Sequence, residues 1–322
     1  MNYAPANIVL PDANPTAIRT LERAGLLAEL ETHGSVRFFD DGPQPADEII
    51  ARARAASVLV TVEPLPSGVI SSLADTLKLI SFTGVGAANH VDLDEARSCG
   101  VVVTNTPGYG DRTVAEHTLM LILAGLRHCV FLDHQLRSGR WDQSRPGRDL
   151  AEQTVGIVGL GRIGSEVARL TSPLSSRLIA WTRSPGTKGN VVDIVELVTL
   201  RDLFQQADVV TVHLSLNESN RGLIGEELLR RMRPGSLLVN TARGELVDEG
   251  ALVAAVQAGR ISAALDVYAD EPLSPEHPLL LSEGVTLTPH VAYNTPTALQ
   301  NIMTIAVNNV RSYLEGRVEN AI

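Results

Sequence analysis

Cysteine is scarce in this sequence. Its 322 residues include two cysteines, Cys99 and Cys129, and they form no C-x-x-C pair. Two cysteines are too few for a disulfide framework, which excludes a small disulfide-stapled scaffold. We predict a reducing compartment in which both side chains are packed thiols, and we predict no metal site.

Two further absences concern charge and hydrophobic length. The chain has no block of lysine and arginine, and its formal net charge is -10, which argues against binding to nucleic-acid phosphates. No apolar run approaches the roughly 18 residues of a membrane span, and the N-terminus lacks the features of a signal peptide. We therefore expect a cytoplasmic protein with small-molecule partners, binding neither nucleic acid nor membrane.

The length and the hydrophobic pattern predict two domains. A chain of 322 residues exceeds the roughly 250 residues at which single hydrophobic cores stop growing. Short apolar strands alternate with helical segments from residue 8 to residue 105, and the alternation resumes after residue 154. This alternation is typical of parallel sheets covered on both faces. We predict an α/β fold with two doubly wound parallel-sheet domains, one flavodoxin-like and one a Rossmann dinucleotide domain.

The segment T-V-G-I-V-G-L-G-R-I-G joins an apolar strand to three glycines spaced G-x-G-x-x-G. Gly159 would permit the bend from strand to helix, Gly161 would let the backbone approach a pyrophosphate, and Gly164 would let the helix lie against the strand. The helix that opens at Arg162 and Ile163 would direct its free N–H groups at the phosphates. The segment predicts a cofactor site, although a tight turn without a ligand also fits it.

The loop T-G-V-G-A at 83–87 follows an apolar segment, L-K-L-I-S-F at 77–82, that we predict to be a strand. Open α/β sheets present their ligand-binding loops at the carboxyl ends of strands. The loop is therefore a candidate ligand site, although its glycines also fit a simple tight turn.

The segment 113–128 is apolar nearly all round. As a helix it should be buried between domains or in an oligomer interface. We interpret His117 within it as a packed or capping histidine.

Three residues follow late strands, at the sheet edge where such folds bind ligands: Arg243, Glu271 and His290. An arginine offers a planar fork of donors to a carboxylate and its adjacent carbonyl. A histidine exchanges a proton near neutral pH, and a carboxylate beside it stabilises and orients the imidazolium. The set predicts reduction of a 2-oxo acid, although each residue also fits a structural role as a surface ion pair, a solvated loop acid or a strand-end cap.

Long segments of this chain resemble the D-isomer-specific 2-hydroxyacid dehydrogenase family. The resemblance covers nearly the whole sequence. Besides the glycine motif, the matching segments are L-K-L-I-S-F-T-G-V-G-A-A-N-H-V-D-L at 77–93, V-V-V-T-N-T-P-G-Y with V-A-E at 114–116, V-N-T-A-R-G-E-L-V-D-E at 239–249, A-L-D-V-Y-A-D-E-P-L at 264–273 and T-P-H at 288–290.

The resemblance implies a role for each predicted site residue. His290 would be the catalytic acid and base, Glu271 its partner, and Arg243 the substrate anchor. The backbone N–H groups of Val85 and Gly86 would hold the substrate carboxylate.

The family's fold implies a split substrate domain, here residues 1–105 plus 292–322, joined to a central cofactor domain, here residues 106–291. Members of the family are usually homodimers, so we expect a homodimer.

The resemblance also implies contacts with a nicotinamide cofactor. Asp266 would face the nicotinamide carboxamide. Two departures from the family pattern concern the adenosine side. The loop after His213 reads H-L-S-L-N-E-S-N and lacks the usual proline and threonines, so its shape and contacts are open. The second cofactor strand ends in W-T-R-S, with no acid to accept from the ribose hydroxyls, and Thr182, Arg183 and Ser184 suit a 2′-phosphate.

We therefore predict that NADP(H) is preferred and that NAD(H) is possible. An alternative for Arg183 is that its guanidinium stacks on adenine or lies in solvent.

Two functions from different classes follow from the resemblance. The first is a reductase of small 2-oxo acids such as glyoxylate, hydroxypyruvate or a bulkier relative. The second is a non-catalytic cofactor-sensing module, because some proteins resembling this family are transcriptional co-repressors that use NAD(H) binding as a switch. The joint presence of Arg243, Glu271 and His290 favours the enzyme.

Overall fold

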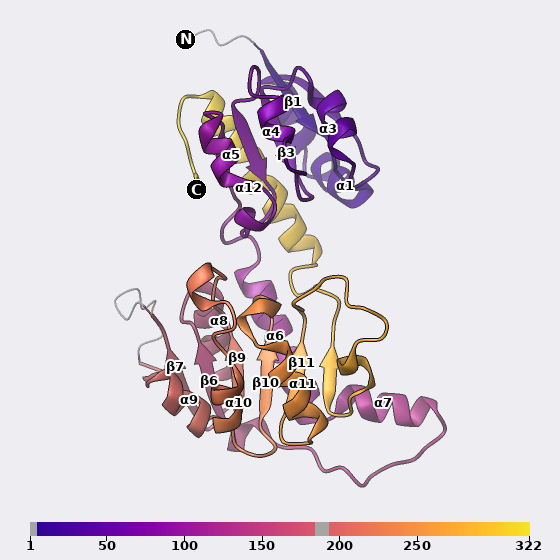
Figure 1. Ribbon diagram of the computed structural model, residues 1–322, viewed down its shortest axis with the longest axis vertical. Coiled ribbons are helices and arrows are strands. Elements are labelled where there is room, and N and C mark those ends of the chain that lie inside the picture. Colours follow the sequence, from indigo (N-terminus) through magenta and orange to yellow (C-terminus); the bar gives the residue numbers. More distant parts are fainter. Residues whose placement is uncertain (1–4, 184–192) are drawn as a thin grey trace. The chain divides into compact units, whose positions relative to one another are not determined.

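The computed structural model describes residues 5–183 and 193–322, and the chain divides into two compact units. Unit 1 consists of Met1–Gly110 with Thr295–Ile322, and unit 2 consists of Asp111–Asn294. Each unit is built on one parallel sheet with helices on its faces (Figure 1). The predicted fold class, α/β with two doubly wound parallel-sheet domains, is confirmed.

The unit boundaries lie a few residues beyond the predicted positions 105 and 292, at Gly110 and Thr295. Residues before the first boundary stay with unit 1 because they pack on its C-terminal helix, where Asn301 Nδ2 donates to the Tyr109 carbonyl at 3.2 Å. At the second boundary Asn294 still donates its N–H to the Val291 carbonyl, at 2.8 Å. That turn therefore remains part of unit 2.

The sheet of unit 1 has the strand order β2-β1-β3-β4-β5. Alternate residues of each strand face opposite sides, so Ile8 and Leu10 join a core under α1, α2 and α12, while Val9 joins a core under α3, α4 and α5. The strands are β1 (Ala6–Leu10), β2 (Gly34–Phe38), β3 (Val58–Thr61), β4 (Leu79–Phe82) and β5 (Val102–Thr104). The helices are α1 (Pro15–Arg23), α2 (Leu26–Glu31), α3 (Ala46–Ala53), α4 (Val69–Ser72), α5 (Leu93–Ser98) and α12 (Pro296–Leu314).

The sheet of unit 2 has the strand order β12-β11-β10-β9-β6-β7-β8, all parallel among the described residues. One face packs under α9, α10 and α11, and the other under α6 and α8. The strands are β6 (Thr154–Val158), β7 (Arg177–Trp181), β8 (Glu196–Leu197), β9 (Val209–Val212), β10 (Leu237–Asn240), β11 (Ser262–Leu265) and β12 (Val285–Leu287). The helices are α6 (Asp111–Leu126), α7 (Cys129–Arg137), α8 (Arg162–Thr171), α9 (Leu200–Gln206), α10 (Glu226–Arg231) and α11 (Glu249–Gln257).

Helix α6, which the sequence predicts to be buried between domains or in an oligomer interface, is partly covered within this single chain. It packs one face on the sheet, where Leu121 and Ile122 are fully buried, but Met120 is 42% exposed and Leu123 is 41% exposed. Within the described part of the chain, no single helix is long and apolar enough to cross a membrane. Helices α6 and α7 together reach that length, but the break between them is bent by 61°.

Candidate active site

The three glycines after β6 have different structural tasks. Gly159 has φ +102°, a left-handed conformation that glycine adopts without strain. A Cβ on Gly159 would lie 2.7 Å from the His213 carbonyl oxygen, and a Cβ on Gly164 would lie 1.9 Å from the Gly159 carbonyl oxygen. A Cβ on Gly161, the N-cap of α8, would meet nothing within 4 Å. Two glycines thus allow the turn, and the third leaves the start of α8 open, which fits a dinucleotide pyrophosphate.

Arg162 and Ile163 form the first turn of α8. The Arg162 side chain is 62% exposed, with Nε 3.8 Å from Asp111 Oδ2. Ile163 is half-buried and packs against the core under α6 and α8. The backbone N–H groups of a first helical turn have no partner within the helix, so this turn offers donors to an anion.

The carboxyl end of β7 carries Thr182, which is half-buried, and Arg183, which is exposed. Arg183 Nη1 lies 3.5 Å from Ser219 Oγ, and the Ser219 hydroxyl donates to Asn217 Oδ1 at 2.6 Å. The loop after β9, whose sequence departs from the family pattern, therefore reaches the end of β7. Ser184, the third residue predicted here, lies outside the described residues.

His213 follows β9 and lies against the glycine turn. Its N–H donates to the Val158 carbonyl at 2.8 Å, and its Nε2 lies 2.8 Å from Thr211 Oγ1. Burial lowers the pKa of His213 from 6.5 to about 3. The imidazole is therefore neutral at physiological pH, and its contact with the cofactor stays a prediction.

His290 and Glu271 form a close pair after β12 and β11. His290 Nδ1 lies 2.6 Å from Glu271 Oε2, and the His290 side chain is 38% exposed. The other carboxylate oxygen, Oε1, accepts from the Tyr268 N–H at 3.0 Å. Burial raises the pKa of Glu271, but the hydrogen bonds from His290 and Tyr268 and the charge of Arg243 outweigh it, so the pKa is lowered. Glu271 is thus a carboxylate that orients the imidazole.

Arg243 follows β10, two residues after Thr241, and is half-buried. Its Nη1 donates to the Ala242 carbonyl at 2.6 Å, and its own carbonyl accepts from Asn240 Nδ2 at 2.8 Å. Its positive charge acts on the Glu271 carboxylate. The structure therefore gathers Arg243, Glu271 and His290 at the carboxyl ends of three adjacent strands, as the sequence predicts.

Asp266 directly follows β11. Its side chain is fully buried, with 0% exposure. Its Oδ1 accepts from the Thr288 hydroxyl at 2.6 Å and from the Val291 N–H at 2.9 Å, and its Oδ2 accepts from the Ala292 N–H at 2.9 Å. These oxygens therefore bind the Thr288 side chain before His290 and two backbone N–H groups after it, and a contact of Asp266 with the nicotinamide stays a prediction.

Val85 and Gly86 lie in unit 1, after β4. Val85 is 49% exposed, and its carbonyl accepts from Asn105 Nδ2 at 2.9 Å. The Gly86 carbonyl accepts from the Asn89 N–H at 3.2 Å. Among residues 5–183 and 193–322, neither Val85 nor Gly86 donates its own N–H to a protein acceptor. Two adjacent amide donors without a protein acceptor suit a carboxylate ligand.

Tyr268 is a member of the site that sequence reasoning missed. Besides the N–H that holds Glu271, its hydroxyl donates to the Thr288 carbonyl at 2.9 Å. Burial, together with the charges of Asp266 and Glu271, raises its pKa to about 12, so the hydroxyl stays protonated. Its only sequence signal was its place inside the motif A-L-D-V-Y-A-D-E-P-L.

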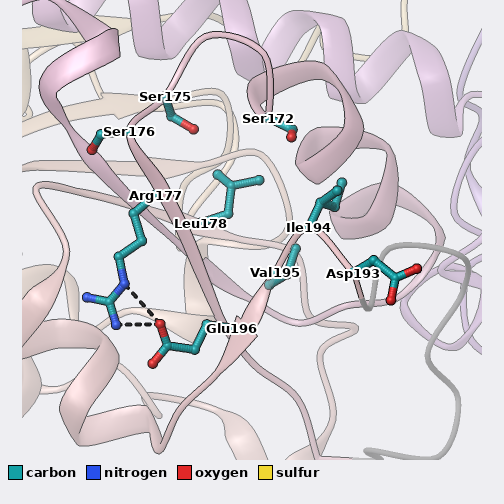
Figure 2. Close-up of a pocket in the computed structure, with 9 residues that line it drawn as sticks. All are labelled: Ser172, Ser175, Ser176, Arg177, Leu178, Asp193, Ile194, Val195 and Glu196. Atoms are coloured by element: carbon teal, nitrogen blue, oxygen red, sulfur yellow. Dashed lines mark hydrogen bonds and ion pairs between the residues drawn. The ribbon is translucent and has the colours of Figure 1, made fainter.

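A hollow of about 430 Å³ lies elsewhere in unit 2, at the start of β7. Figure 2 shows Arg177 beside this hollow with its guanidinium bound to Glu196, at 2.6 and 3.0 Å, and Arg177 also donates to Gln206 at 3.0 Å. The hollow is at the amino end of the strand, whereas ligands of such sheets bind at the carboxyl ends. It is therefore not part of the candidate active site.

Several known proteins are similar to this chain over most of its length. The family model "D-isomer specific 2-hydroxyacid dehydrogenase, NAD binding domain" matches residues 119–292. The chain is 37% identical to glyoxylate reductase of Aeropyrum pernix over 287 residues, which cover 86% of this chain and 85% of that protein. It is 33% identical to D-3-phosphoglycerate dehydrogenase of Archaeoglobus fulgidus over 98% of this chain and 58% of that protein. The crystal structure of a glyoxylate reductase from Paecilomyes thermophila matches with a TM-score of 0.86 at 27% identity, covering 99% of each chain.

The fold and the site thus define a nicotinamide-dependent oxidoreductase. The chain belongs to the D-isomer specific 2-hydroxyacid dehydrogenases. It is an oxidoreductase that acts on the CH–OH group of donors with NAD(P) as acceptor. The roles of individual residues within this chemistry stay predictions.

Proposed function

We propose that His290 gives a proton to the carbonyl oxygen of a 2-oxo acid during reduction and takes it back from the 2-hydroxy acid during oxidation. The observation that carries this role is the 2.6 Å pair between His290 Nδ1 and Glu271. It leaves Nε2 as the ring nitrogen that reaches a substrate. A bound nicotinamide cofactor supplies the hydride in reduction and accepts it in oxidation.

Arg243 acts in this proposal as the substrate anchor. A guanidinium binds a carboxylate and an adjacent carbonyl through two parallel N–H donors, and its charge stabilises the oxygen on which negative charge develops. The unpaired N–H groups of Val85 and Gly86 hold the substrate carboxylate. Two observations support this role of Val85 and Gly86. Their carbonyls accept hydrogen bonds, and their N–H groups have no acceptor among the described residues.

We further propose that the substrate's side group is small and uncharged. Asp12 and Glu63 follow β1 and β3, whose carboxyl ends lie at the same sheet edge as the loop 83–87. Burial and, after it, the charge of Asp12 raise the pKa of Glu63, and two carboxyl groups at this edge would repel a further anion. The Arg52 guanidinium is already paired with two carboxylates. Glyoxylate and hydroxypyruvate fit this edge better than phosphohydroxypyruvate, and a panel of kcat/KM values for the three tests the order.

The test of the catalytic role is turnover by His290→Gln. Loss of general acid–base catalysis should lower kcat by about 10²- to 10⁴-fold, while the Kd for the cofactor stays unchanged. His33→Gln in unit 1 is the matched control. A near-normal kcat in His290→Gln would remove His290 from its role. Cofactor binding by the wild type without turnover of any 2-oxo acid would instead favour the sensing module.

Arg243→Lys tests the anchor separately. An ammonium keeps the charge but lacks the planar fork, so we expect kcat/KM for the 2-oxo acid to fall by at least about tenfold, the equivalent of one lost charge-assisted hydrogen bond. If only KM rose, and by a trivial factor, Arg243 would be a structural residue.

We propose that NADP(H) is the preferred cofactor and that NAD(H) is also used. Thr182 and Arg183 end β7 without a carboxylate, and the exposed Arg183 guanidinium lies beside the hydroxyl of Ser219. A guanidinium and two hydroxyls suit a 2′-phosphate. Hydrogen bonds to charged groups contribute about 1.5 to 3 kcal/mol each, so one or two correspond to a preference of about ten- to a thousandfold.

Arg183→Ala tests this preference. It should weaken kcat/KM for NADPH far more than for NADH, whereas Arg230→Ala should change neither, because Arg230 pairs with Glu226 on its own helix. Equal use of both cofactors by the wild type, or loss of NADH activity alone in Arg183→Ala, would leave NAD(H) as the working cofactor.

We also propose that the protein is a homodimer. Helix α7 has no buried residue, and apolar side chains are exposed along α6, α7 and the segment that follows. They are Met120, Leu123, Val130, Leu136 and Trp141.

A further inference from the structure

A chain of hydrogen bonds runs from helix α6 to the loop that carries His290. His117 Nε2 lies 3.1 Å from Thr288 Oγ1, and the Thr288 hydroxyl donates to Asp266 Oδ1 at 2.6 Å. Asp266 in turn accepts the N–H groups of Val291 and Ala292, both at 2.9 Å. The chain of hydrogen bonds therefore ends on the two residues that follow His290.

The donor and acceptor pattern fixes the tautomer of His117. A threonine hydroxyl has one hydrogen, and Thr288 gives it to Asp266. His117 Nε2 must therefore carry a hydrogen and donate it to Thr288, with Asp266 Oδ1 also 3.5 Å away. Burial lowers the pKa of His117, opposed by the charge of Asp266, so the neutral Nε2–H form is the one that fits.

The loop at His290 needs such support. His290 has φ +51°, in the left-handed region that residues with a side chain adopt uncommonly. Its own N–H donates to the Asp266 carbonyl at 2.8 Å. Asp266 thus fixes three consecutive backbone N–H groups, those of His290, Val291 and Ala292, and Thr288 and His117 fix the Asp266 carboxylate.

Helix α6 supports the neighbouring strand end in a similar way. Thr118, the residue after His117, donates its hydroxyl to the Val114 carbonyl at 2.8 Å. Its oxygen lies 2.9 Å from Thr241 Oγ1, two residues before Arg243. Adjacent residues of one helix therefore contact both the loop of His290 and the loop of Arg243.

We propose that His117 and Thr288 are positioning residues for His290, acting through the buried carboxylate of Asp266. This inference rests on the proposed role of His290 as the proton donor. The hydrogen-bond chain fixes the backbone next to His290, while Glu271 holds the Nδ1 atom of the imidazole. Neither His117 nor Thr288 needs to contact substrate or cofactor for this effect.

The experiment compares two variants that break the hydrogen-bond chain with two that keep its donor groups. Thr288→Val and His117→Leu remove the hydroxyl and the ring N–H. Thr288→Ser keeps the hydroxyl, and His117→Gln presents an amide N–H at the position of Nε2. Small misplacements of a catalytic group cost up to about a hundredfold in rate, so we expect kcat to fall by about tenfold or more in Thr288→Val and His117→Leu. Thr288→Ser and His117→Gln should retain most of it.

Two further measurements separate positioning from general damage. The Kd for the cofactor should stay within about twofold of the wild type in all four variants. A wild-type kcat in Thr288→Val and His117→Leu would overturn the inference, and so would equal losses in the breaking and the conserving variants. If Thr288→Val does not fold, His117→Leu decides.

His290→Gln is measured in the same assay. If His290→Gln keeps its activity, the proposed function fails, and the positioning role with it. If His290→Gln loses its activity while Thr288→Val and His117→Leu do not, the proposed function stands and the positioning inference alone is overturned.

Discussion

At the residue scale, the Glu271 carboxylate carries a prediction about the pH dependence of the reaction. Its pKa is lowered, despite burial, by the hydrogen bonds from His290 and Tyr268 and by the charge of Arg243. A carboxylate that stabilises the imidazolium extends the protonated form to higher pH. In Glu271→Gln we therefore expect the rate of 2-oxo acid reduction to fall off at lower pH than in the wild type. The pH profile of kcat/KM measures this, with Glu276→Gln in the same loop as the control, and an unchanged profile would contradict the pairing.

The half-buried His213 allows a prediction about stability. Its pKa is lowered from 6.5 to about 3, so between these values the unfolded chain binds a proton that the folded chain does not. The free energy of unfolding therefore decreases as the pH falls below about 6.5 and recovers as the pH rises. His213→Gln removes this titration. We expect the drop in Tm between about pH 7 and about pH 4.5 to be smaller in His213→Gln than in the wild type.

His33→Gln is the control for that measurement, because His33 lies in the other unit. Equal pH dependence of Tm in His213→Gln and the wild type would show that His213 is not held neutral by the fold.

The residues of the site differ in how far the sequence predicts them. Arg243, Glu271 and His290 were predicted because each follows an apolar strand, and parallel strands bring such positions to one edge. The contact of His117 with Thr288 spans 171 residues, and no local pattern signals it. Asp266 was predicted to face the cofactor, but its burial depends on how the loop at 288–292 folds back over it. Side-chain partners of this kind follow from tertiary packing, which the local sequence does not encode.

At the element scale, the turn from β6 to α8 allows a matched pair of substitutions. A Cβ on Gly164 would lie 1.9 Å from the Gly159 carbonyl, whereas a Cβ on Gly161 would meet nothing within 4 Å. Gly164→Ala should therefore destabilise the fold by about 1 to 3 kcal/mol, as overpacking does. Gly161→Ala should keep the wild-type Tm and still bind cofactor at least about tenfold more weakly, because its methyl group stands where the pyrophosphate approaches the backbone.

Thermal unfolding and cofactor titration of both variants check this pair. Undiminished cofactor affinity in Gly161→Ala would show that the pyrophosphate does not approach the start of α8.

Local patterns explain why this part of the fold was predictable. The strand, the glycine turn and the start of α8 are encoded in neighbouring residues, and the structure has them at Thr154–Val158 and Arg162–Thr171. The unit boundaries were less accurate, because residues up to Gly110 belong to unit 1 through contacts with α12. Those contacts join segments that are nearly 200 residues apart in the chain.

At the scale of the whole molecule, exposed apolar side chains on unit 2 predict self-association. Leu136 is 58% exposed and Trp141 is 80% exposed, and α7, which precedes Trp141, has no buried residue. Large exposed apolar patches often mark protein interfaces, so we expect this surface to contact another chain. A symmetric pair in which each copy covers the other's α7 would remove it from water, and cyclic dimers are the commonest closed assembly.

Leu136→Ser with Trp141→Ser should therefore shift the protein from dimer to monomer in light scattering after size-exclusion chromatography. Each large apolar side chain contributes about 1.5 to 3 kcal/mol when it is buried, and in a symmetric dimer each substitution counts twice. The matched control is Leu281→Ser, because Leu281 is 85% exposed and lies before β12, outside α6 and α7. A dimer that persists in the double variant, or a wild type that is already monomeric, would contradict an interface on α7.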